Sequence, residues 1–485
     1  MQELKMPEKT RRASKDSGLI TRLLETLDAD NIQYCHWKSN WRIGQWLEGK
    51  GDLDLLIGRH DITKFAAVLS GLGFKKAIPP REKEVPGVVN FYGYDPKIQD
   101  FINVHAHYQL VFGNELTNNY RLPVERSLLA GSNREGIIFV ASHEMELVLF
   151  VIRTVLKFSA LERLGKALIG ERANCEKKIF GELNYLEDRV DPEKLESVLH
   201  EQFQFLDKQF FNECLALLGQ KSSLLKKMEL NFKMKKALSD YSRSHFLIEH
   251  LTRAKRGLIK VGRKLLRKKN PGKRFEGGGM LLAFVGGDGA GKTTSVNEIS
   301  KWLSRKFEVR NAHLGKPPKS FLTLLVGAVL KIRRKLSGSS DEFGSKPIFL
   351  QRLRWLCTAR DRYRLYKRIR RDAANGLIVI CDRYPIPNLN LMDAPKIPDE
   401  TGGRLVRIEK RFYRNILPPE QLFVLRVEPN TAVDRKPDEP SPYVFRRSKE
   451  LWKIDWRDSN ACLIDANRPL DSVLSDLRNR VWASL

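Results

Sequence analysis

Residues 280–294 read MLLAFVGGDGAGKTT, and this stretch decides the fold of the C-terminal half of the chain. Its first six residues are apolar and predict a buried strand, while GGDGAGKTT satisfies the pattern G-x-x-x-x-G-K-[ST]. The glycines let successive backbone N–H groups converge on phosphate oxygens, and the helix expected from Lys292 points its positive end at them. The alternative is a glycine-rich turn that happens to contain a lysine. The strand before the loop and the helix after it favour a nucleotide-binding site.

The residues of this loop are the predicted ATP-binding residues: Gly286, Gly287, Asp288, Gly289, Ala290, Gly291, Lys292, Thr293 and Thr294. In a loop of this kind the lysine reaches the β- and γ-phosphates, and the hydroxyl of Thr293 binds Mg²⁺. Lys292 and Asp288 are therefore catalytic candidates, and Thr293 is a candidate metal ligand.

A second apolar run, LIVICDRY at residues 377–384, predicts a strand that ends in Asp382 and Arg383. A carboxylate at the carboxyl end of a parallel strand faces the crevice where ligands bind. Asp382 is thus a candidate for catalysis and for the Mg²⁺ shell, and Arg383 is a candidate for gripping a phosphate through two hydrogen bonds. The alternative is an exposed ion pair at a strand end.

The C-terminal half alternates between strand and helix patterns, which is typical of an α/β fold with a parallel sheet flanked by helices. Strands are predicted at residues 280–285, 377–381 and 422–427, and helices at 292–306, 350–374 and 470–481.

Together these motifs resemble the thymidylate kinase family, over roughly residues 281–482. In that family D-G-A-G-K-T-T opens the ATP site, a helix with an A-D-R-like motif precedes the second-substrate strand, and D-R-Y ends that strand. The resemblance implies a P-loop phosphotransferase that uses ATP and Mg²⁺. The matching helix here carries Ala359-Arg360-Asp361-Arg362, so Arg360 or Arg362 is expected to contact the acceptor.

The resemblance continues beyond residues 422–427, where Arg435 lies in the approach to a lid and Arg446 and Arg447 follow. Arginines of a lid would close over the transferring phosphoryl group and neutralise its charge. Because the phosphate-binding loop contains no arginine, the lid is the expected source, with Arg435 and Arg446 as the catalytic candidates. The alternative is a solvated basic loop.

The acceptor side departs from the family. Residues 313–317 read HLGKP where thymidylate kinases carry R-E-P-G, so the thymidine-phosphate clamp is not recognisable. Asp393 is a candidate for binding an acceptor hydroxyl, although a loop aspartate is also a common turn former. His313 and Lys316 are further candidates. The expected acceptor is a small molecule, either a nucleoside monophosphate or a related metabolite.

In the N-terminal half, GDLDLLI at residues 51–57 places Asp52 and Asp54 on one face of a strand, where paired carboxylates can hold Mg²⁺. With Trp37-Lys38-Ser39-Asn40 upstream, this resembles the DNA-polymerase-β-like nucleotidyltransferase fold, which implies an α+β domain. The third carboxylate of that superfamily would fall at Asn103, an amide, so transfer activity is left open. The alternative is a solvated strand edge.

Helical periodicity replaces the strand patterns from residue 142 to about 234, and a basic amphipathic stretch follows. The predicted division is therefore a nucleotidyltransferase-like domain at 1–140, a helical domain at 141–242, a basic helix and linker at 243–279, and the kinase-like domain at 280–485. Residues 243–274 hold twelve Lys or Arg residues and one acid, Glu249. The apolar stripe among these charges favours an anionic membrane surface or domain packing over nucleic acid.

The whole chain of 485 residues has a formal net charge of +28, which favours anionic partners. Its six cysteines show no metal or disulfide spacing, which fits a reducing cytoplasm. Residues 1–17 are expected to be a polar leader rather than a secretory signal. A homodimer is left open.

Three functions compete at this point. The first is an ATP-dependent phosphotransferase. The second is a nucleotide-sensing binding module with little turnover, which the amide at Asn103 and the missing thymidine clamp favour. The third is a bifunctional enzyme of surface-polysaccharide precursor synthesis, suggested by the fusion of two nucleotide-handling folds alone.

Overall fold

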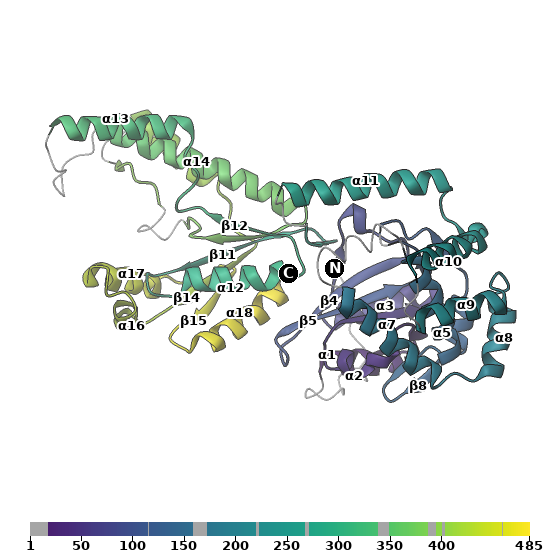
Figure 1. Cartoon of the computed structure of the whole chain (residues 1–485). Helices are drawn as coiled ribbons and strands as arrows, with labels where there is room; N and C mark the ends of the chain where they lie inside the picture. The colour runs from purple at the N-terminus through teal and green to yellow at the C-terminus, as the bar shows by residue number, and fades with distance from the viewer. Residues whose placement is uncertain are drawn as a thin grey trace. The chain divides into compact units, whose positions relative to one another are not determined.

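The computed structural model describes residues 18–114, 116–158, 172–219, 223–266, 271–337, 349–386, 394–399, 403–457 and 459–485. The chain divides into two compact units, Met1–Asn270 and Pro271–Leu485 (Figure 1). This boundary falls inside the linker predicted at 243–279, whereas the leader predicted at 1–17 lies outside the described residues. Nowhere in the described part of the chain is a helix both long and apolar enough to span a bilayer.

The second unit is built on a parallel sheet with the strand order β12-β13-β11-β14-β15. These strands are β11 (Met280–Gly286), β12 (Val309–His313), β13 (Ile378–Asp382), β14 (Gln421–Arg426) and β15 (Ala461–Asp465). The strand β11 lies at the centre, and the later strands continue on both sides of it. In such a sheet ligands bind beyond the carboxyl end of the strand where the winding reverses, which here is the end of β11.

The helices of this unit are α12 (Lys292–Ser304), α13 (Phe321–Ser337), α14 (Phe349–Ala374), α15 (Gly403–Arg414), α16 (Pro429–Asp434), α17 (Ser441–Lys453) and α18 (Leu470–Ser484). The long α14 packs on β11 and β13, and α13 runs beside it (Figure 1). The central strands are buried on both faces, which explains why β11, β13 and β14 read as continuous apolar runs. The predicted α/β fold with a parallel sheet is confirmed.

The first unit contains a mixed sheet in which the strands follow the order β3-β4-β5-β2-β1-β9-β8. They are β1 (Tyr34–His36), β2 (Asp52–Ile57), β3 (Lys75–Ile78), β4 (Val88–Asp95), β5 (Asp100–His107), β8 (Asn133–Glu135) and β9 (Ile138–Val140). A separate hairpin pairs β6 (Leu110–Phe112) with β7 (Tyr120–Leu122). The parallel pairing of β2 with β5 sets Asp52 opposite Asn103 and Asp54 opposite His105.

Two groups of helices pack around this sheet. The first group consists of the helices that lie between the strands along the chain: α1 (Leu19–Ala29), α2 (Ile43–Leu47), α3 (Ile62–Gly71) and α4 (Glu125–Ala130). The later helices are α5 (His143–Leu156), α7 (Arg172–Glu187), α8 (Pro192–Gln202), α9 (Lys208–Gly219), α10 (Leu224–Ala237) and α11 (Phe246–Leu265). One apolar cluster joins Trp37 and Leu56 of the sheet region to Phe150 of α5 and Phe211 of α9. The sheet and the helical segment of this unit therefore share a core.

Candidate active site

The loop between β11 and α12 has the backbone geometry that its glycines predict. Gly289 and Gly291 adopt φ of 80° and 77°, the left-handed region that residues with a side chain rarely occupy. A Cβ on Gly289 would lie 2.6 Å from the carbonyl oxygen of Ala432. Glycine is therefore required at this position both for its conformation and for the close approach of the chain between β14 and the lid.

Lys292 starts α12 and is 6% exposed. Its ammonium donates to the carbonyl oxygen of Gly287 at 2.6 Å, inside the loop itself. Burial lowers the pKa of Lys292 to about 8, against the opposing effect of the nearby Asp288 carboxylate. A phosphate brought into the loop would supply the negative charge that this buried ammonium lacks.

Two oxygen ligands suited to Mg²⁺ lie at the edge of the loop. The Thr293 hydroxyl oxygen is 3.5 Å from Oδ2 of Asp382, the last residue of β13. Asp382 is 8% exposed, and its Oδ1 has no hydrogen-bond partner among the described residues. A buried, unpartnered carboxylate oxygen beside a hydroxyl fits a hard cation that prefers oxygen ligands.

Asp288 is held between two arginines. The guanidinium of Arg447 donates to Oδ2 of Asp288, and Nη2 of Arg383 lies 3.5 Å from Oδ1. Burial alone would raise the pKa of Asp288, but the hydrogen bond from Arg447 and the positive charges nearby lower it overall. Arg383 has φ of 57°, a strained left-handed conformation for a residue with a side chain, and such strain is concentrated at functional sites.

The arginines predicted for a lid differ in position. Arg447 of α17 is the one in contact with the phosphate-binding loop, whereas Arg446 is exposed. Arg435 follows α16 and donates to the carbonyl oxygen of Ala466 at 2.9 Å. The sequence contained a signal for this difference, because Val444 and Leu451 are spaced as one helical face, and Arg447 lies on that face while Arg446 does not.

The arginines expected on the acceptor side are engaged with the protein. Arg362 is 3% exposed; its Nε donates to the Leu314 carbonyl oxygen at 2.7 Å, and its Nη1 donates to the Tyr413 hydroxyl. It therefore secures the turn that follows β12. Arg360 donates to the Ser320 hydroxyl at 2.7 Å, while its buried Nε has no partner among the described residues. That orphaned donor makes Arg360 the better placed of the two for an anionic acceptor.

His313 ends β12 and is paired in register with Asp382 of β13, so it lies at the same edge of the sheet. Its Nδ1 accepts a hydrogen bond from the Lys316 backbone N–H at 3.1 Å. Asp393 lies outside the described residues. The edge that holds the phosphate-binding loop thus also presents His313, Asp382 and Arg383.

These contacts place a buried lysine, a hydroxyl–carboxylate pair and two arginines around one loop. Residues 284–477 match the thymidylate kinase family model.

Relatives align over the same half of the chain. The uncharacterised ATP-binding protein YghR of Escherichia coli is 26% identical over 219 residues, which cover 41% of this chain and 86% of YghR. A probable thymidylate kinase of Pyrobaculum calidifontis is 29% identical over 218 residues, covering 42% of this chain and 99% of the relative. The thymidylate kinase of Fervidobacterium nodosum is 24% identical over 210 residues, which cover 40% of this chain and 94% of that relative. The thymidylate kinase-like part of the chain is therefore its second unit.

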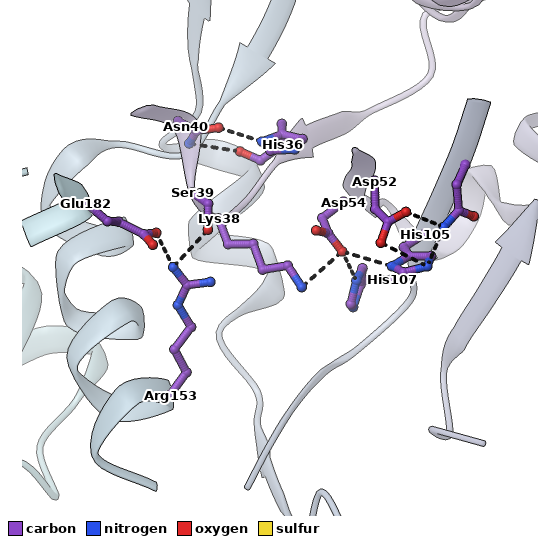
Figure 2. A network of polar contacts seen from close by, with 11 residues as sticks. His36, Lys38, Ser39, Asn40, Asp52, Asp54, His105, His107, Arg153 and Glu182 are labelled. Atoms are coloured by element: carbon purple, nitrogen blue, oxygen red, sulfur yellow. Dashed lines mark hydrogen bonds and ion pairs between the residues drawn. The ribbon is translucent and has the colours of Figure 1, made fainter. Parts of the chain in front are cut away.

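A second polar site lies in the first unit, outside the matched residues (Figure 2). Oδ1 of Asp54 is 3.0 Å from Nζ of Lys38, 3.1 Å from His107 and 3.3 Å from His105. Burial would raise the pKa of Asp54, yet Lys38 and the two histidines hold it well below its usual value. Burial lowers the pKa of His107 to about 4, so that ring is neutral at pH 7. Among the groups that lower the pKa of Asp54, the ammonium of Lys38 has the largest effect.

Asp52 keeps a side chain that is 45% exposed, and its Oδ1 accepts a hydrogen bond from the Asn103 amide at 2.6 Å. Asn103, predicted at the position of the third carboxylate, therefore contacts Asp52. Within the described residues no group of three or more His, Cys, Asp or Glu residues is arranged to hold a metal ion. With Asp54 already paired to Lys38, this donor set suits a divalent cation poorly, and Mg²⁺ binding by Asp52 and Asp54 stays a prediction.

Ser39 joins the site to the helices. It has φ of 59°, and its hydroxyl accepts a hydrogen bond from Arg153 of α5 at 3.1 Å. Arg153 also pairs with Glu182 of α7 (Figure 2). The turn that carries Lys38 and Ser39 is therefore fixed by an ion pair between two helices that the motif alone does not reveal.

The pKa of Lys292 leads to a prediction about pH. Above pH 8 the free site holds a neutral amine, and bound triphosphate restores the ammonium, so ATP binding should take up about half a proton at pH 8. Isothermal titration calorimetry at pH 8 in two buffers of different ionisation enthalpy measures this uptake. In Lys292→Arg the guanidinium keeps its charge and the uptake should disappear. Equal uptake by both proteins would contradict the assignment.

The contact of Arg447 with Asp288 leads to a second prediction. Arg447→Ala should lower kcat/KM for phosphoryl transfer by at least about 100-fold, because it removes a cation held at the phosphate-binding loop. The neighbouring, exposed Arg446 is the matched control, and Arg446→Ala should change kcat/KM less than about threefold. Steady-state kinetics of both variants measures the two losses, after thermal melting has shown that the variants are equally stable. A larger loss of kcat/KM for Arg446→Ala would reverse the roles of the two arginines.

Proposed function

We propose that the second unit is an ATP-dependent phosphotransferase that moves the γ-phosphoryl group of ATP to a nucleoside monophosphate or a related small metabolite. The observation that carries the proposal is the loop geometry: Lys292, Asp382 and Arg447 come from three different elements and converge on one phosphate-binding loop. The match of residues 284–477 to the thymidylate kinase family model supports the same reaction class.

Each group has a separate task in this proposal. The loop backbone and Lys292 would bind the β- and γ-phosphates. Thr293 and Asp382 would hold Mg²⁺, which would offset the negative charge of the phosphates. Arg447 is paired with Asp288 in the free protein. The phosphates compete with Asp288 for that guanidinium, so substrate binding draws Arg447 toward the phosphoryl group.

The acceptor is expected beyond the ends of β12 and β13, on the side of Arg383 and Arg360. The orphaned Nε of Arg360 and the guanidinium of Arg383 both favour an acceptor that carries negative charge. Asp393 is kept as a candidate for an acceptor hydroxyl. A cytoplasmic location, expected from the scattered cysteines, is kept as part of the proposal.

The experiment is a panel of acceptors. Purified protein is mixed with ATP, Mg²⁺ and either nucleoside monophosphates or sugar acceptors, and ADP release is followed. We expect release that depends on one acceptor class and falls at least about 100-fold in Lys292→Ala, because the loop loses its buried cation.

The same panel separates the competing functions. ATP binding with no turnover on any acceptor would replace the phosphotransferase with a nucleotide-sensing module. Turnover on sugar acceptors alone would support a role in surface-polysaccharide precursor chemistry.

For the first unit we propose nucleotide binding in which Lys38 supplies the positive charge that a metal ion would otherwise supply. The support is the Lys38–Asp54 pair, together with an amide at Asn103 where a third carboxylate is expected. The resemblance to nucleotidyltransferases is the reason for naming a nucleotide as the ligand.

This second proposal is tested in a Lys292→Ala background, in which the loop of the second unit no longer binds ATP well. Nucleotide affinity should change less than about threefold when EDTA replaces Mg²⁺, and Lys38→Ala should weaken it at least about tenfold. Lys50, an exposed lysine paired with Glu48, is the matched control. Binding that requires Mg²⁺ and is lost in Asp52→Asn would instead identify Asp52 and Asp54 as metal ligands.

A further inference from the structure

The helix α11 packs on the first unit through a polar face. Glu249 is 7% exposed and accepts hydrogen bonds from Thr117 and Asn119, each at 3.1 Å. Arg256 donates to the Leu116 carbonyl oxygen at 2.6 Å, and Arg263 pairs with Glu82. Glu249, Arg256 and Arg263 are spaced by seven residues, so they lie on one face of the helix. This polar face therefore contacts the rest of the first unit.

The opposite face is apolar and exposed. Its residues, with their exposed fractions, are Leu247 (63%), Leu251 (72%), Leu258 (73%), Val261 (55%) and Leu265 (79%). At about 3.6 residues per turn they form one stripe, centred about half a turn from Glu249 and Arg256. Amphipathic helices of globular proteins normally bury the apolar face, and α11 has the reverse orientation. A stripe of this kind marks a surface for a partner rather than part of the core.

The charges beside the stripe restrict the partner. Lys255 is exposed and lies about 75° around the helix from the centre of the stripe, whereas Lys260 is exposed at nearly the same angle as Glu249. Arg253 is half-buried. From His250 to Leu266 the sequence contains no acidic residue, and Glu249 is taken by the contacts with Thr117 and Asn119. The outward face is therefore apolar with Lys255 on one flank, and it carries no carboxylate.

An anionic lipid bilayer fits this combination better than the alternatives. A second copy of α11 would bring lysines against lysines, and single-stranded nucleic acid is bound through aromatic side chains that the stripe lacks. A helix that lies in the bilayer interface places leucines at the acyl boundary and lysines at the headgroups. With 20 residues, α11 would extend about 30 Å along such a surface.

We propose that α11 is an interfacial membrane anchor: its exposed leucine stripe inserts into the headgroup region of a bilayer, and its exposed lysines, Lys255 beside the stripe and Lys260 farther around the helix, bind the phosphates of anionic lipids. The polar face keeps its contacts with the first unit, so docking requires no unfolding. The consequence is a chain held reversibly at a membrane surface. This inference does not depend on the phosphotransferase activity.

The test is flotation of the full chain with vesicles. Vesicles contain either phosphatidylcholine alone or phosphatidylcholine with about one third phosphatidylglycerol, an anionic fraction high enough to attract a polybasic helix. We expect the chain to float with the anionic vesicles only, and the bound fraction to fall as salt is raised. The double variant Leu251→Gln/Leu258→Gln should lose at least about tenfold in affinity, since it removes the centre of the stripe.

The matched control is Leu225→Gln/Phe232→Gln on α10, two side chains that are 79% and 67% exposed. This variant should float like the unmodified chain, and Lys255→Glu/Lys260→Glu should not float. ATP binding by the second unit and circular dichroism check that each variant is folded.

Three results would overturn the proposal. The first is an unmodified chain that stays at the bottom of the gradient at low salt. The second is a dimer in sedimentation that becomes a monomer in Leu251→Gln/Leu258→Gln, which would make the occupant a second copy. The third is a fall in the melting temperature of that variant without vesicles, which would make the occupant another part of the same chain.

Discussion

The arrangement of charges at the site of the second unit depends on the buried ammonium of Lys292. A charge of this kind is costly to bury without partners, and in the free protein it relies on one carbonyl oxygen and the field of two carboxylates. The parallel sheet fixes where those carboxylates lie, because Asp382 ends the strand next to β11. Lys292, Arg383 and Arg447 then face Asp288 and Asp382, leaving an excess of positive charge. The site is incomplete without an anion, and a polyphosphate supplies one.

The strands and helices around this loop could be predicted because each is specified locally. The runs at β11, β13 and β14 are continuously apolar, and the helices α12, α14 and α18 have clear periodicity. The strand β12 was missed, since VRNAH shows neither alternation nor an apolar run. It becomes a strand only because β13 pairs with it. The strand β15 was missed although ACLID is mostly apolar, because five residues do not distinguish a strand from another buried segment. The helices α15 to α17 were missed as well, because charged and polar residues interrupt their apolar positions.

The site residues divide in the same way. Lys292, Thr293, Asp382 and Arg383 were identified from motifs whose chemistry lies close in sequence. The contact of Arg447 with Asp288 spans 159 positions, so the contact itself could not be predicted, although the spacing of Val444 and Leu451 places Arg447 on the buried face of α17. Arg362 was expected at the acceptor, but its side chain is buried and donates a hydrogen bond to the Leu314 carbonyl oxygen. In the first unit, the motif WKSN gave no sign that the Lys38 side chain reaches Asp54, because the helix α2 separates the motif from β2.

The pairing of Arg447 with Asp288 also affects how much ATP the proposed enzyme would hydrolyse without an acceptor. A phosphotransferase that arranges its catalytic groups around ATP alone exposes the γ-phosphoryl group to water and hydrolyses its own substrate. Here the lid arginine is retained by a carboxylate of the loop, so drawing it away requires competing negative charge. ATP provides part of that charge, and an anionic acceptor provides more. In the proposed phosphotransferase, the same ion pair would delay assembly of the reactive arrangement until both substrates are present, which would limit hydrolysis of ATP without transfer.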